Sequence, residues 1–490
     1  MWPAAVFLRI RKGGPVVTGL PIQRLMIQCG LAPWRRFQYR DGDMEAARHA
    51  EKTRRLRDTL LSAPGGNIRL GKSTSNLFRD RPVAASHRLD VRDFNEVLHV
   101  DPESGQVVVE GMTPYVKLVS ECLKYNVMPA VVPQLKSITI GGATAGCGIE
   151  SSSFRYGLVH ETVQEMEILL GDGSIVTCAP ENEYRDLFYG FPNSYGTLGY
   201  CLSLRAKTVP VKPYVKLSHI RHKDPADFFS DLEQRCGRHE VDFVDGVVFG
   251  RDDMVITLGQ FADEAPYTSD YTYERIYYKS LRERPEDFLT TEDYLWRWDT
   301  DWFWCSKNLL AQNPLIRRLY GRRRLNSVTY TNIMRWNNRW KLSSSIERLL
   351  GYHSESVIQD VELPIEHAGE FLAFYHDVIR FMPVWICPVH AYDDKARFDL
   401  YRMDPDKLYV NFGFWDVIRD REKRPPGYFN RQIEEKVIAL EGMKSLYSES
   451  YFSSEQFWNI YNRPVYERLK NKYDPDGTLK DLYHKCVLKE

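Results

Sequence analysis

Residues 133–157, PQLKSITIGGATAGCGIESSSFRYG, form the stretch that decides the fold. The stretch is rich in glycine and serine, carries little charge, and lies between segments that have the composition of strands. Glycines 141, 142, 146, 148 and 157 allow the backbone to come close to a bulky group. The serines and the exposed N–H groups offer hydrogen-bond donors to an anion. These properties predict a loop that binds a pyrophosphate.

A second candidate phosphate loop precedes it, at RLGKSTSNL, residues 69–77. Gly71 allows a tight turn. The five residues after it offer donors to phosphate oxygens: Lys72, Ser73, Thr74, Ser75 and Asn76. Taken alone this is a weak signal, because most serine-rich runs are ordinary loops.

Two other phosphate-binding motifs do not fit these loops. Gly146, Gly148 and Ser151 approximate the dinucleotide fingerprint G-x-G-x-x-G, but a serine stands at the third glycine. No amphipathic helix follows, and no acidic residue closes a βαβ unit. Gly71-Lys72-Ser73 lacks the upstream glycine of a Walker loop.

The order of features after the main loop resembles a known flavoprotein family. Tyr156-Gly157 closes the loop, an alternating segment follows over residues 163–170, and Gly171-Asp172-Gly173 turns into a short strand over 174–178. Gly196-Thr197-Leu198-Gly199 comes about twenty residues later. This order is similar to that of the FAD domain named after vanillyl-alcohol oxidase and p-cresol methylhydroxylase (PCMH-type). In that family two pyrophosphate loops lie about seventy residues apart, as the two loops do here.

Longer stretches resemble the Diminuto-type Δ24-sterol reductases and, more closely, their bacterial relatives that saturate methylene-branched fatty acyl chains. They include GIESSSFRYGL (148–158), DLFYGFPNSYGTLGY (186–200), DYLWRWDTDWFWCS (293–306), VWICP (384–388) and YDPDGTLKDLYHKC (473–486). The resemblance runs from about residue 55 to the C-terminus. It implies an α+β protein with a two-lobed PCMH-type FAD-binding domain over 44–213 and a mixed-sheet substrate (cap) domain over 214–449. Residues 450–490 would pack back on the FAD domain, and residues 1–43 are an N-terminal extension of uncertain nature.

Local patterns predict further elements. Good helix formers with leucines at 56, 60 and 61 predict a helix over 44–62, and a helical pattern recurs over 454–471. Strand patterns cover residues 107–109, 163–170 and 214–222.

The resemblance also implies which residues hold FAD. From the first loop these are Gly71, Lys72, Ser73, Thr74, Ser75 and Asn76. From the second loop they are Pro133, Gln134, Gly141, Gly142, Ala143, Gly146, Gly148, Ile149, Ser151, Ser152, Ser153 and Gly157. Val163, Gly196 and Gly199 complete the set. No histidine stands where some members attach the flavin, so we expect non-covalent FAD.

The aromatic run YLWRWDTDWFW, residues 294–304, has two interpretations. It is either a core or interface helix with its charged residues on the solvent-exposed face, or a wall of a lipid pocket. Aromatic faces also stabilise positive charge that develops on an alkene carbon. An unconjugated C=C bond needs such help, because it must be protonated towards a tertiary cation while reduced flavin supplies hydride.

The proton donor is therefore the catalytic residue to find. We expect Tyr451, which stands in LYSESYFSSEQFW, a segment close to the sterol-reductase sequences, with Asp299 and Asp301 as alternatives. Weaker candidates are Glu362, His376, His390 and His484. The predicted function is an FAD-dependent, NADPH- or NADH-consuming reductase of a C=C bond in a lipid, either a methylene-branched acyl chain or a Δ24-sterol side chain. The alternatives are an alcohol or aldonolactone-type flavin oxidase and a non-catalytic flavin-bearing lipid-binding protein.

Composition limits the partners and the compartment. Basic and acidic residues number 66 each, which argues against a nucleic-acid partner. The nine cysteines form no C-x-x-C pair, as expected for free thiols in a reducing compartment without a metal site. Apolar runs are too short to span a membrane. Residues 1–30 are either a weak membrane-surface segment or translation from a misplaced start, so we expect a cytoplasmic protein with peripheral membrane contact left open, and an oligomeric state that the sequence does not give.

Overall fold

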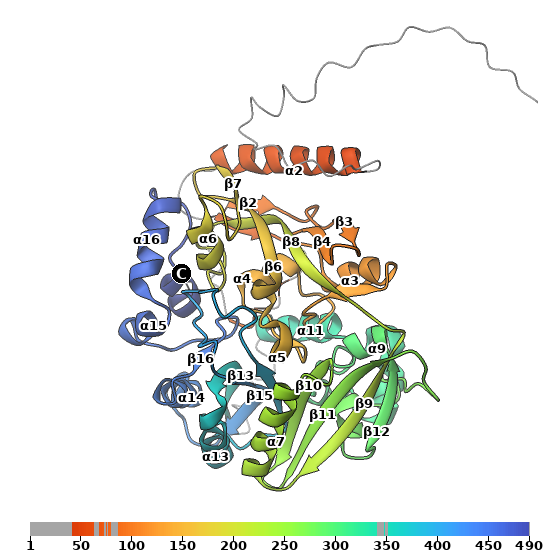
Figure 1. Cartoon of the computed structure of the whole chain (residues 1–490). Coiled ribbons are helices and arrows are strands. Elements are labelled where there is room, and N and C mark those ends of the chain that lie inside the picture. Colours follow the sequence, from red (N-terminus) through yellow and green to blue (C-terminus); the bar gives the residue numbers. More distant parts are fainter. Residues whose placement is uncertain are drawn as a thin grey trace, which may run out of the picture. The chain divides into compact units, whose positions relative to one another are not determined.

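Two antiparallel β-sheets organise the part of the chain that the structure describes (Figure 1). This computed structural model describes residues 42–62, 68–72, 75, 77–79, 87–340, 347 and 351–489. From Met44 onward the chain forms one compact unit. The predicted extension, residues 1–43, lies almost wholly outside the described residues.

The first sheet has the strand order β3-β4-β8-β6-β7, and β5 pairs with β8. Its strands are β3 (Val97–Asp101), β4 (Gln106–Glu110), β5 (Val127–Pro129), β6 (Val163–Leu169), β7 (Ile175–Cys178) and β8 (Tyr200–Pro210). A separate parallel pair consists of β1 (Ile68–Gly71) and β2 (His87–Asp90). The strands predicted at 107–109, 163–170 and 174–178 are thus confirmed.

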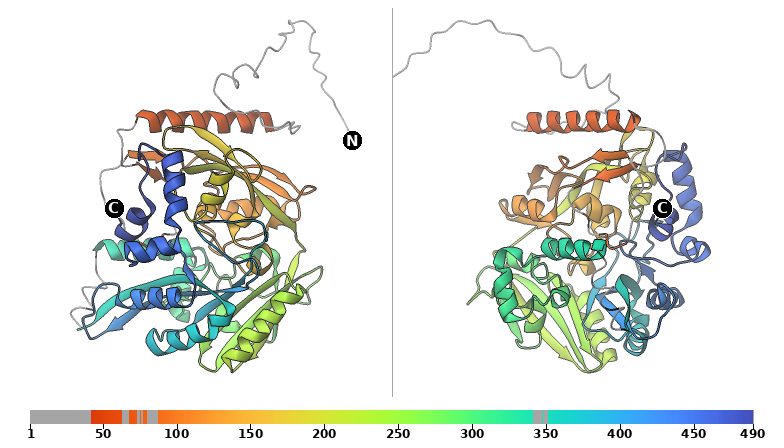
Figure 2. Two further views of the ribbon diagram at one scale, coloured as in Figure 1. Left: turned by 60° about the vertical axis from the view of Figure 1, so that its left-hand side comes forward. Right: turned by 180° about the vertical axis from the view of Figure 1, so that it is seen from behind.

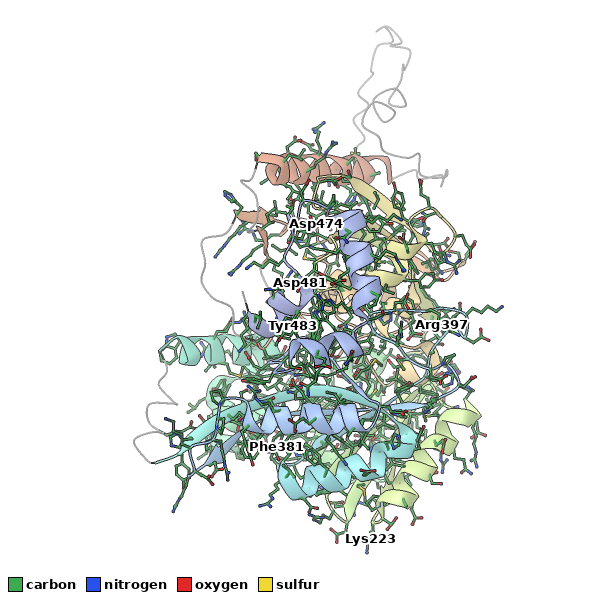
Figure 3. The ribbon with its side chains drawn as sticks, turned by 90° about the vertical axis from the view of Figure 1, so that its left-hand side faces the viewer. Lys223, Phe381, Arg397, Asp474, Asp481 and Tyr483 are labelled. Carbon is green, nitrogen blue, oxygen red and sulfur yellow. The ribbon has the colours of Figure 1, made fainter. Side chains whose placement is uncertain are left out.

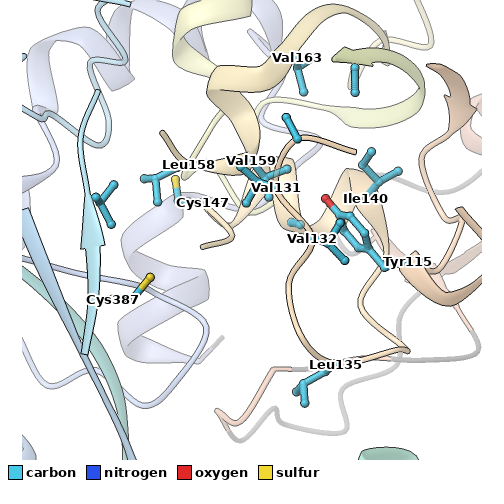
Figure 4. Close-up of a cluster of buried hydrophobic side chains, with 14 of the residues drawn as sticks. Tyr115, Val131, Val132, Leu135, Ile140, Cys147, Leu158, Val159, Val163 and Cys387 are labelled. Atoms are coloured by element: carbon cyan, nitrogen blue, oxygen red, sulfur yellow. The ribbon is translucent and has the colours of Figure 1, made fainter. Parts of the chain in front are cut away.

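The helices of this region are short except for the first. They are α2 (Gly42–Ser62), α3 (Tyr115–Leu123), α4 (Ile140–Ala145), α5 (Ser153–Tyr156), the 3-10 turn η1 (Val159–Thr162) and α6 (Arg185–Gly190). Helix α2, predicted over 44–62, buries Leu56 and Leu60 in a cluster with Leu89 and Phe94. Figure 4 shows the main core of this region, where Tyr115, Val131 and Ile140 pack together with Val159 and Val163.

The second sheet has the order β12-β9-β11-β10-β14-β15-β13-β16. Its strands are β9 (Tyr214–His222), β10 (Phe243–Gly250), β11 (Asp253–Ala262), β12 (Glu286–Thr290), β13 (His353–Pro364), β14 (Val384–Val389), β15 (Tyr409–Asp420) and β16 (Met443–Lys444). Its neighbouring strands are all antiparallel, so the expected mixed sheet is corrected. The reason is that each strand–helix–strand crossover does join two parallel strands, but a third strand, β11 or β15, inserts antiparallel between them.

Two βαββ units therefore stand side by side in this sheet. The first is β9-α7-β10-β11, with α7 at Pro225–Arg238, and the second is β13-α13-β14-β15, with α13 at Ala368–Val378. They meet where β10 pairs with β14 at Val247 and Trp385. Helices α7, α13 and α14 (Tyr428–Ala439) cover one face of the sheet (Figure 1).

Strand alternation divides the side chains between the two faces of this sheet. On the helix-covered face, Val357, Val361 and Phe412 pack with α7 and α13 in one apolar cluster. The opposite face carries Trp385 and Trp415, which belong to the core shared with the first sheet. Asp360 and Ile358 are two residues apart on β13, so both point to the face that carries Trp385 and Trp415. This face therefore presents a carboxyl group beside two indole rings.

The remaining elements connect and close these sheets. They are α8 (Tyr277–Ser280), α9 (Thr291–Leu295), η2 (Cys305–Leu309), α10 (Pro314–Tyr320), η3 (Arg322–Arg324), α11 (Ser327–Trp340), η4 (Ile365–His367), α15 (Ser454–Ile460), α16 (Arg463–Tyr473) and η5 (His484–Leu488). The single helix predicted over 454–471 is divided at Asn462, whose φ of 54° is left-handed. None of the described helices is both long and apolar enough to cross a bilayer.

The C-terminal segment packs against the first region (Figure 2). Lys472 Nζ and Tyr473 Oη both bind the Asp186 carboxylate of α6, at 2.8 and 2.5 Å. Lys470 Nζ donates to the carbonyl oxygen of Thr197 at 2.9 Å. Lys485 Nζ of η5 donates to the carbonyl oxygen of Gly196 at 3.5 Å, so the C-terminal segment lies next to the 193–199 segment, whose glycines the sequence assigns to the cofactor.

Candidate active site

A cavity of about 340 Å³ lies where the glycine-rich loop, the second sheet and the C-terminal segment meet. Its lining includes these predicted cofactor residues: Lys72, Ser75, Pro133, Gln134, Gly141, Gly142, Ala143, Gly146, Gly148, Ile149, Gly196 and Gly199. The two predicted loops, far apart in sequence, thus line one space together.

The glycines of the loop serve different purposes. A Cβ on Gly141 would lie 2.6 Å from the carbonyl oxygen of Gly111, so glycine is required there by a backbone crossing inside the protein. A Cβ on Gly148 would crowd Val159 and Ala143 at 3.0 and 3.1 Å. A Cβ on Gly142 would meet only the Thr139 hydroxyl, at 2.8 Å. Gly142 is therefore the loop position whose lack of a side chain best serves a ligand in the cavity.

Basic side chains outnumber acidic ones in this lining. The basic residues are Arg69, Lys72, Arg79, Lys480, Lys485 and Lys489, and the one acidic residue among the described lining residues is Asp360. Lys480, Lys485 and Lys489 come from the C-terminal segment, which folds back to the loop. Such a wall attracts a dianionic pyrophosphate.

An aromatic wall completes the cavity. Trp302 and Phe303 line it together with Trp385, Trp415 and Tyr447. The Phe303 ring centroid is 4.2 Å from that of Trp415 and 5.5 Å from that of Trp385. Both Trp302 and Phe303 have left-handed backbones, with φ of 44° and 58°. Bulky residues rarely adopt this conformation, which costs about 1–3 kcal/mol each, and such strain clusters at functional sites.

One carboxyl group faces this aromatic wall. Asp360 is half-buried, and Asn411 Nδ2 donates to its Oδ1 at 3.2 Å. The Tyr447 hydroxyl also hydrogen-bonds Asp360 and accepts from Trp415 Nε1 at 2.8 Å. Removal from water outweighs both hydrogen bonds and raises the pKa of Asp360 to about 6. Asp360 therefore holds a proton at mildly acidic pH inside an apolar cavity.

The donor set fits FAD. Gln134 lies in the cavity lining and is 4% exposed, yet its Nε2 finds no hydrogen-bond partner among the described residues. An unpartnered buried amide is costly unless a ligand satisfies it. Together with the basic side chains and the bare backbone at Gly142, this gives donors and space for a phosphate-bearing cofactor.

Comparisons with known proteins agree with this geometry. Residues 66–179 match the family model described as an FAD binding domain. The chain is 26% identical to the human Δ24-sterol reductase over 422 residues, which cover 82% of this chain and 78% of that protein. It is 27% identical to the pea Δ24-sterol reductase over 83% of this chain and 77% of the relative. A rice cytokinin dehydrogenase is 27% identical over 31% of this chain and 30% of its own length.

Residues 66–179 form an FAD-binding domain, and the chain is an FAD-dependent oxidoreductase. It is similar to Δ24-sterol reductases over four-fifths of its length.

Several predicted cofactor residues of this FAD-dependent oxidoreductase lie elsewhere. The Ser151 hydroxyl donates to Glu150, the Ser152 hydroxyl donates to the carbonyl oxygen of Ala130, and the Ser153 hydroxyl accepts from the Glu150 N–H. These three serines are fully buried away from the cavity, so their assignment as phosphate donors is corrected.

Other loop positions are also reassigned. Gly157 has a φ of 68° beside the Glu161 carboxylate, and Val163 packs in the core, so neither lines the cavity. Gly71 is the last residue of strand β1, where it pairs with Asp90 of β2, and it does not line the cavity. Ser73, Thr74 and Asn76 lie outside the described residues.

The three expected proton donors are absent from the cavity lining. Tyr451 packs its ring near Gly427 and Arg431, in a separate groove of the surface. Asp299 accepts from Ser327 Oγ at 2.6 Å and from the Lys136 N–H at 3.0 Å. Asp301 binds Arg317 through both carboxylate oxygens, at 2.7 and 2.9 Å. Buried partners therefore occupy both aspartates. The run is buried, as its interpretation as a core segment requires, but its charges do not lie on a solvent-exposed face.

The weaker donor candidates also lie outside the lining. Glu362 hydrogen-bonds Tyr401, and loss of water raises its pKa to about 8. His376 is on α13, His390 donates its N–H to Ser153 O, and His484 is exposed beside Asp481.

Sequence reasoning missed Asp360, Tyr447 and the three C-terminal lysines. No local motif marks them, because Asp360, Tyr447 and the C-terminal lysines come from three separate parts of the chain and meet only in the fold. The available signal was the alternation of side chains along β13. Residues 358 and 360 point to the same face of the strand, so the apolar Ile358 indicated that Asp360 also points towards the protein interior.

Proposed function

We propose that this oxidoreductase is an FAD-dependent, NADPH- or NADH-consuming reductase of a C=C bond in a lipid. The substrate class is a methylene-branched fatty acyl chain or a Δ24-sterol side chain. The observation that carries the proposal is that one cavity combines a basic, glycine-lined part with an aromatic wall beside a half-buried carboxyl group, that of Asp360. The similarity to Δ24-sterol reductases supports the same chemistry.

FAD would be held non-covalently by the Gly141–Gly142 loop, by Gln134 and by the lysines of the lining. When bound, FAD supplies the hydride. The surrounding aromatic rings keep water out and stabilise positive charge on the tertiary alkene carbon.

The proton comes from Asp360 in this proposal, and Tyr447 holds the Asp360 carboxyl group in place. The Tyr447 hydroxyl is the obvious rival, but burial raises its pKa well above the usual value for a phenol. The pKa of Asp360, about 6, lies far below that of the buried phenol, so the carboxyl group is much the stronger acid. Asp360 supplies the proton to the less substituted alkene carbon, and the hydride goes to the tertiary carbon. Together these two transfers complete the reduction.

The experiment uses the purified full chain, loaded with FAD, under anaerobic conditions. NADPH or NADH should bleach the flavin absorbance. Addition of a Δ24-sterol or of a methylene-branched acyl lipid should restore the absorbance, and mass spectrometry should detect a product two mass units heavier. Restoration of absorbance by air alone, without a heavier lipid product, would instead identify an oxidase.

A further inference from the structure

A basic and apolar surface covers the turn before α10, α10 itself, η3 and α11. We call residues 310–336 the 310–336 surface. Residues 302–346 contain seven arginines and two lysines but no aspartate or glutamate, although basic and acidic residues balance over the whole chain. The right-hand view of Figure 2 shows α11 on the near side of the molecule. The mechanism above does not use this surface.

Exposed apolar side chains gather on the 310–336 surface. Of the twelve large apolar side chains that are exposed in the described residues, five belong to it: Leu310, Leu315, Leu319, Val328 and Trp336. Leu319 is 80% exposed, Leu315 is 70% exposed and Trp336 is 57% exposed. Leu315 and Leu319 lie four residues apart on α10, so they project from one side of that helix.

Arginines surround these side chains. Arg318, Arg323 and Arg324 are exposed, and none has an ion-pair partner within the ranges that the structure describes. Arg322 pairs with Asp270, which lies outside the segment. The 310–336 surface thus combines exposed apolar side chains with arginines that have no acidic partner among the described residues.

The surface adjoins the cavity. The Arg335 guanidinium of α11 donates to the carbonyl oxygen of Ser75, and Ser75 lines the cavity. A partner bound at the surface would therefore lie next to the space in which we place the lipid reaction.

We propose that the 310–336 surface docks on an anionic lipid bilayer. Exposed leucines and a tryptophan beside arginines suit the boundary between headgroups and acyl chains, where the rings and apolar tips enter and the guanidinium groups meet lipid phosphates. A second copy fits poorly, because a symmetric contact would oppose arginine clusters without any acid in the segment. A nucleic acid would leave the leucines without an apolar partner. The inference adds a substrate source to the proposed function.

The test measures sedimentation of the full FAD-loaded protein with vesicles of equal phosphatidylcholine and phosphatidylglycerol. Arg323→Glu with Arg324→Glu should weaken binding by at least about thirtyfold, since each lost cation near an anionic surface is worth a factor of about five and the added carboxylates repel the surface further. Leu315→Ser with Leu319→Ser should weaken it on the order of tenfold. Lys223→Glu with Arg238→Glu is the matched control, because both residues are exposed near the ends of α7, and Figure 3 places Lys223 away from α11.

Binding of the control variant should equal that of the wild type, and all variants should keep the flavin content and melting temperature of the wild type. Equal loss in the control, or no loss in either test variant, would overturn the docking surface. So would a wild type that ignores vesicles but binds duplex DNA or dimerises through the same residues. Vesicle binding requires no turnover, so a failure of lipid reduction would contradict the proposed function alone.

Discussion

Arg297 and Glu150 are 147 positions apart in sequence, yet Arg297 Nη2 lies 2.9 Å from Glu150 Oε1 in the protein interior. The same nitrogen lies 2.9 Å from Asp245 Oδ2, and Asp245 also accepts from Trp385 Nε1 at 3.3 Å. This cluster joins the end of the glycine-rich loop to β10 and to the aromatic wall. It thereby fixes three parts of the cavity relative to one another.

Replacement of Arg297 by methionine should lower the free energy of unfolding by about 3–5 kcal/mol, because two buried carboxylates lose their counter-charge. Urea unfolding measures this loss. Arg463→Met is the control, since Arg463 pairs with Glu467 on the exposed side of α16 and should change little. Equal stability of the Arg297 variant and the wild type would contradict the structural role of the cluster.

Gly142→Val should abolish flavin binding while the protein without flavin keeps most of its stability, because the added side chain meets only the Thr139 hydroxyl. The flavin of the wild type should be released into the supernatant by acid or heat, which absorbance of the supernatant would show. Gly141→Ala should behave differently and destabilise the protein even without flavin, because its Cβ would lie 2.6 Å from the Gly111 oxygen. Wild-type flavin content in Gly142→Val would exclude this loop from the cofactor site.

Asp360→Asn should slow product formation a hundredfold or more, the usual loss for a missing general acid, while NADPH still reduces the flavin. In the wild type the rate should fall about tenfold per pH unit above the Asp360 pKa of about 6, and stopped-flow measurement of product formation over pH tests this. Tyr451→Phe should retain the wild-type rate. The reverse pattern, a fast Asp360 variant and a slow Tyr451 variant, would return the role to Tyr451.

Stability of the Asp360→Asn variant separates chemistry from folding. The pKa of Asp360 is raised in the folded state, so its carboxyl group reduces stability as pH rises from about 4 to about 6. At pH 7 the asparagine variant should therefore be more stable than the wild type by roughly 1–2 kcal/mol, less than the full shift because the carboxyl faces the cavity. A loss of activity with a gain of stability cannot come from misfolding.

The direction of addition is testable with isotopes. Reduction in deuterated water with ordinary NADPH should place one solvent deuterium on the less substituted alkene carbon, because protonation there leaves positive charge on the tertiary carbon. Mass spectrometry of product fragments locates the label. Deuterium on the tertiary carbon would reverse the assigned order of proton and hydride.

Helix α2 should give the protein a pH dependence of its own. His49 is buried between Glu110 and Glu167, at 2.8 and 3.0 Å. Burial alone would lower the pKa of His49, but the hydrogen bonds to these carboxylates raise it to about 9. The charged His49 ring should therefore add roughly 2–3 kcal/mol to the free energy of unfolding. This stabilisation is fully present below pH 6.5 and should be lost as pH rises through about 9. His49→Gln should remove this slope; an unchanged slope would contradict it.

The sequence predicted those parts of the fold that local patterns determine. Alternation located β4, β6 and β9, and the glycines located the loop. The serines 151–153 were misassigned because a run of hydroxyl groups does not reveal which side of the loop faces the protein. Asp360 and Lys485 were missed because 125 positions separate them and only tertiary packing brings both to the cavity.

Five described cavity-lining residues other than glycine have left-handed backbones: Cys147, Tyr195, Trp302, Phe303 and Lys489. Glycine would relieve the strain at each position. Selection of variants by melting temperature alone would therefore favour glycine at all five. It would produce a more stable protein whose cavity had lost three of its aromatic rings, so engineering of this enzyme has to measure turnover as well as heat resistance.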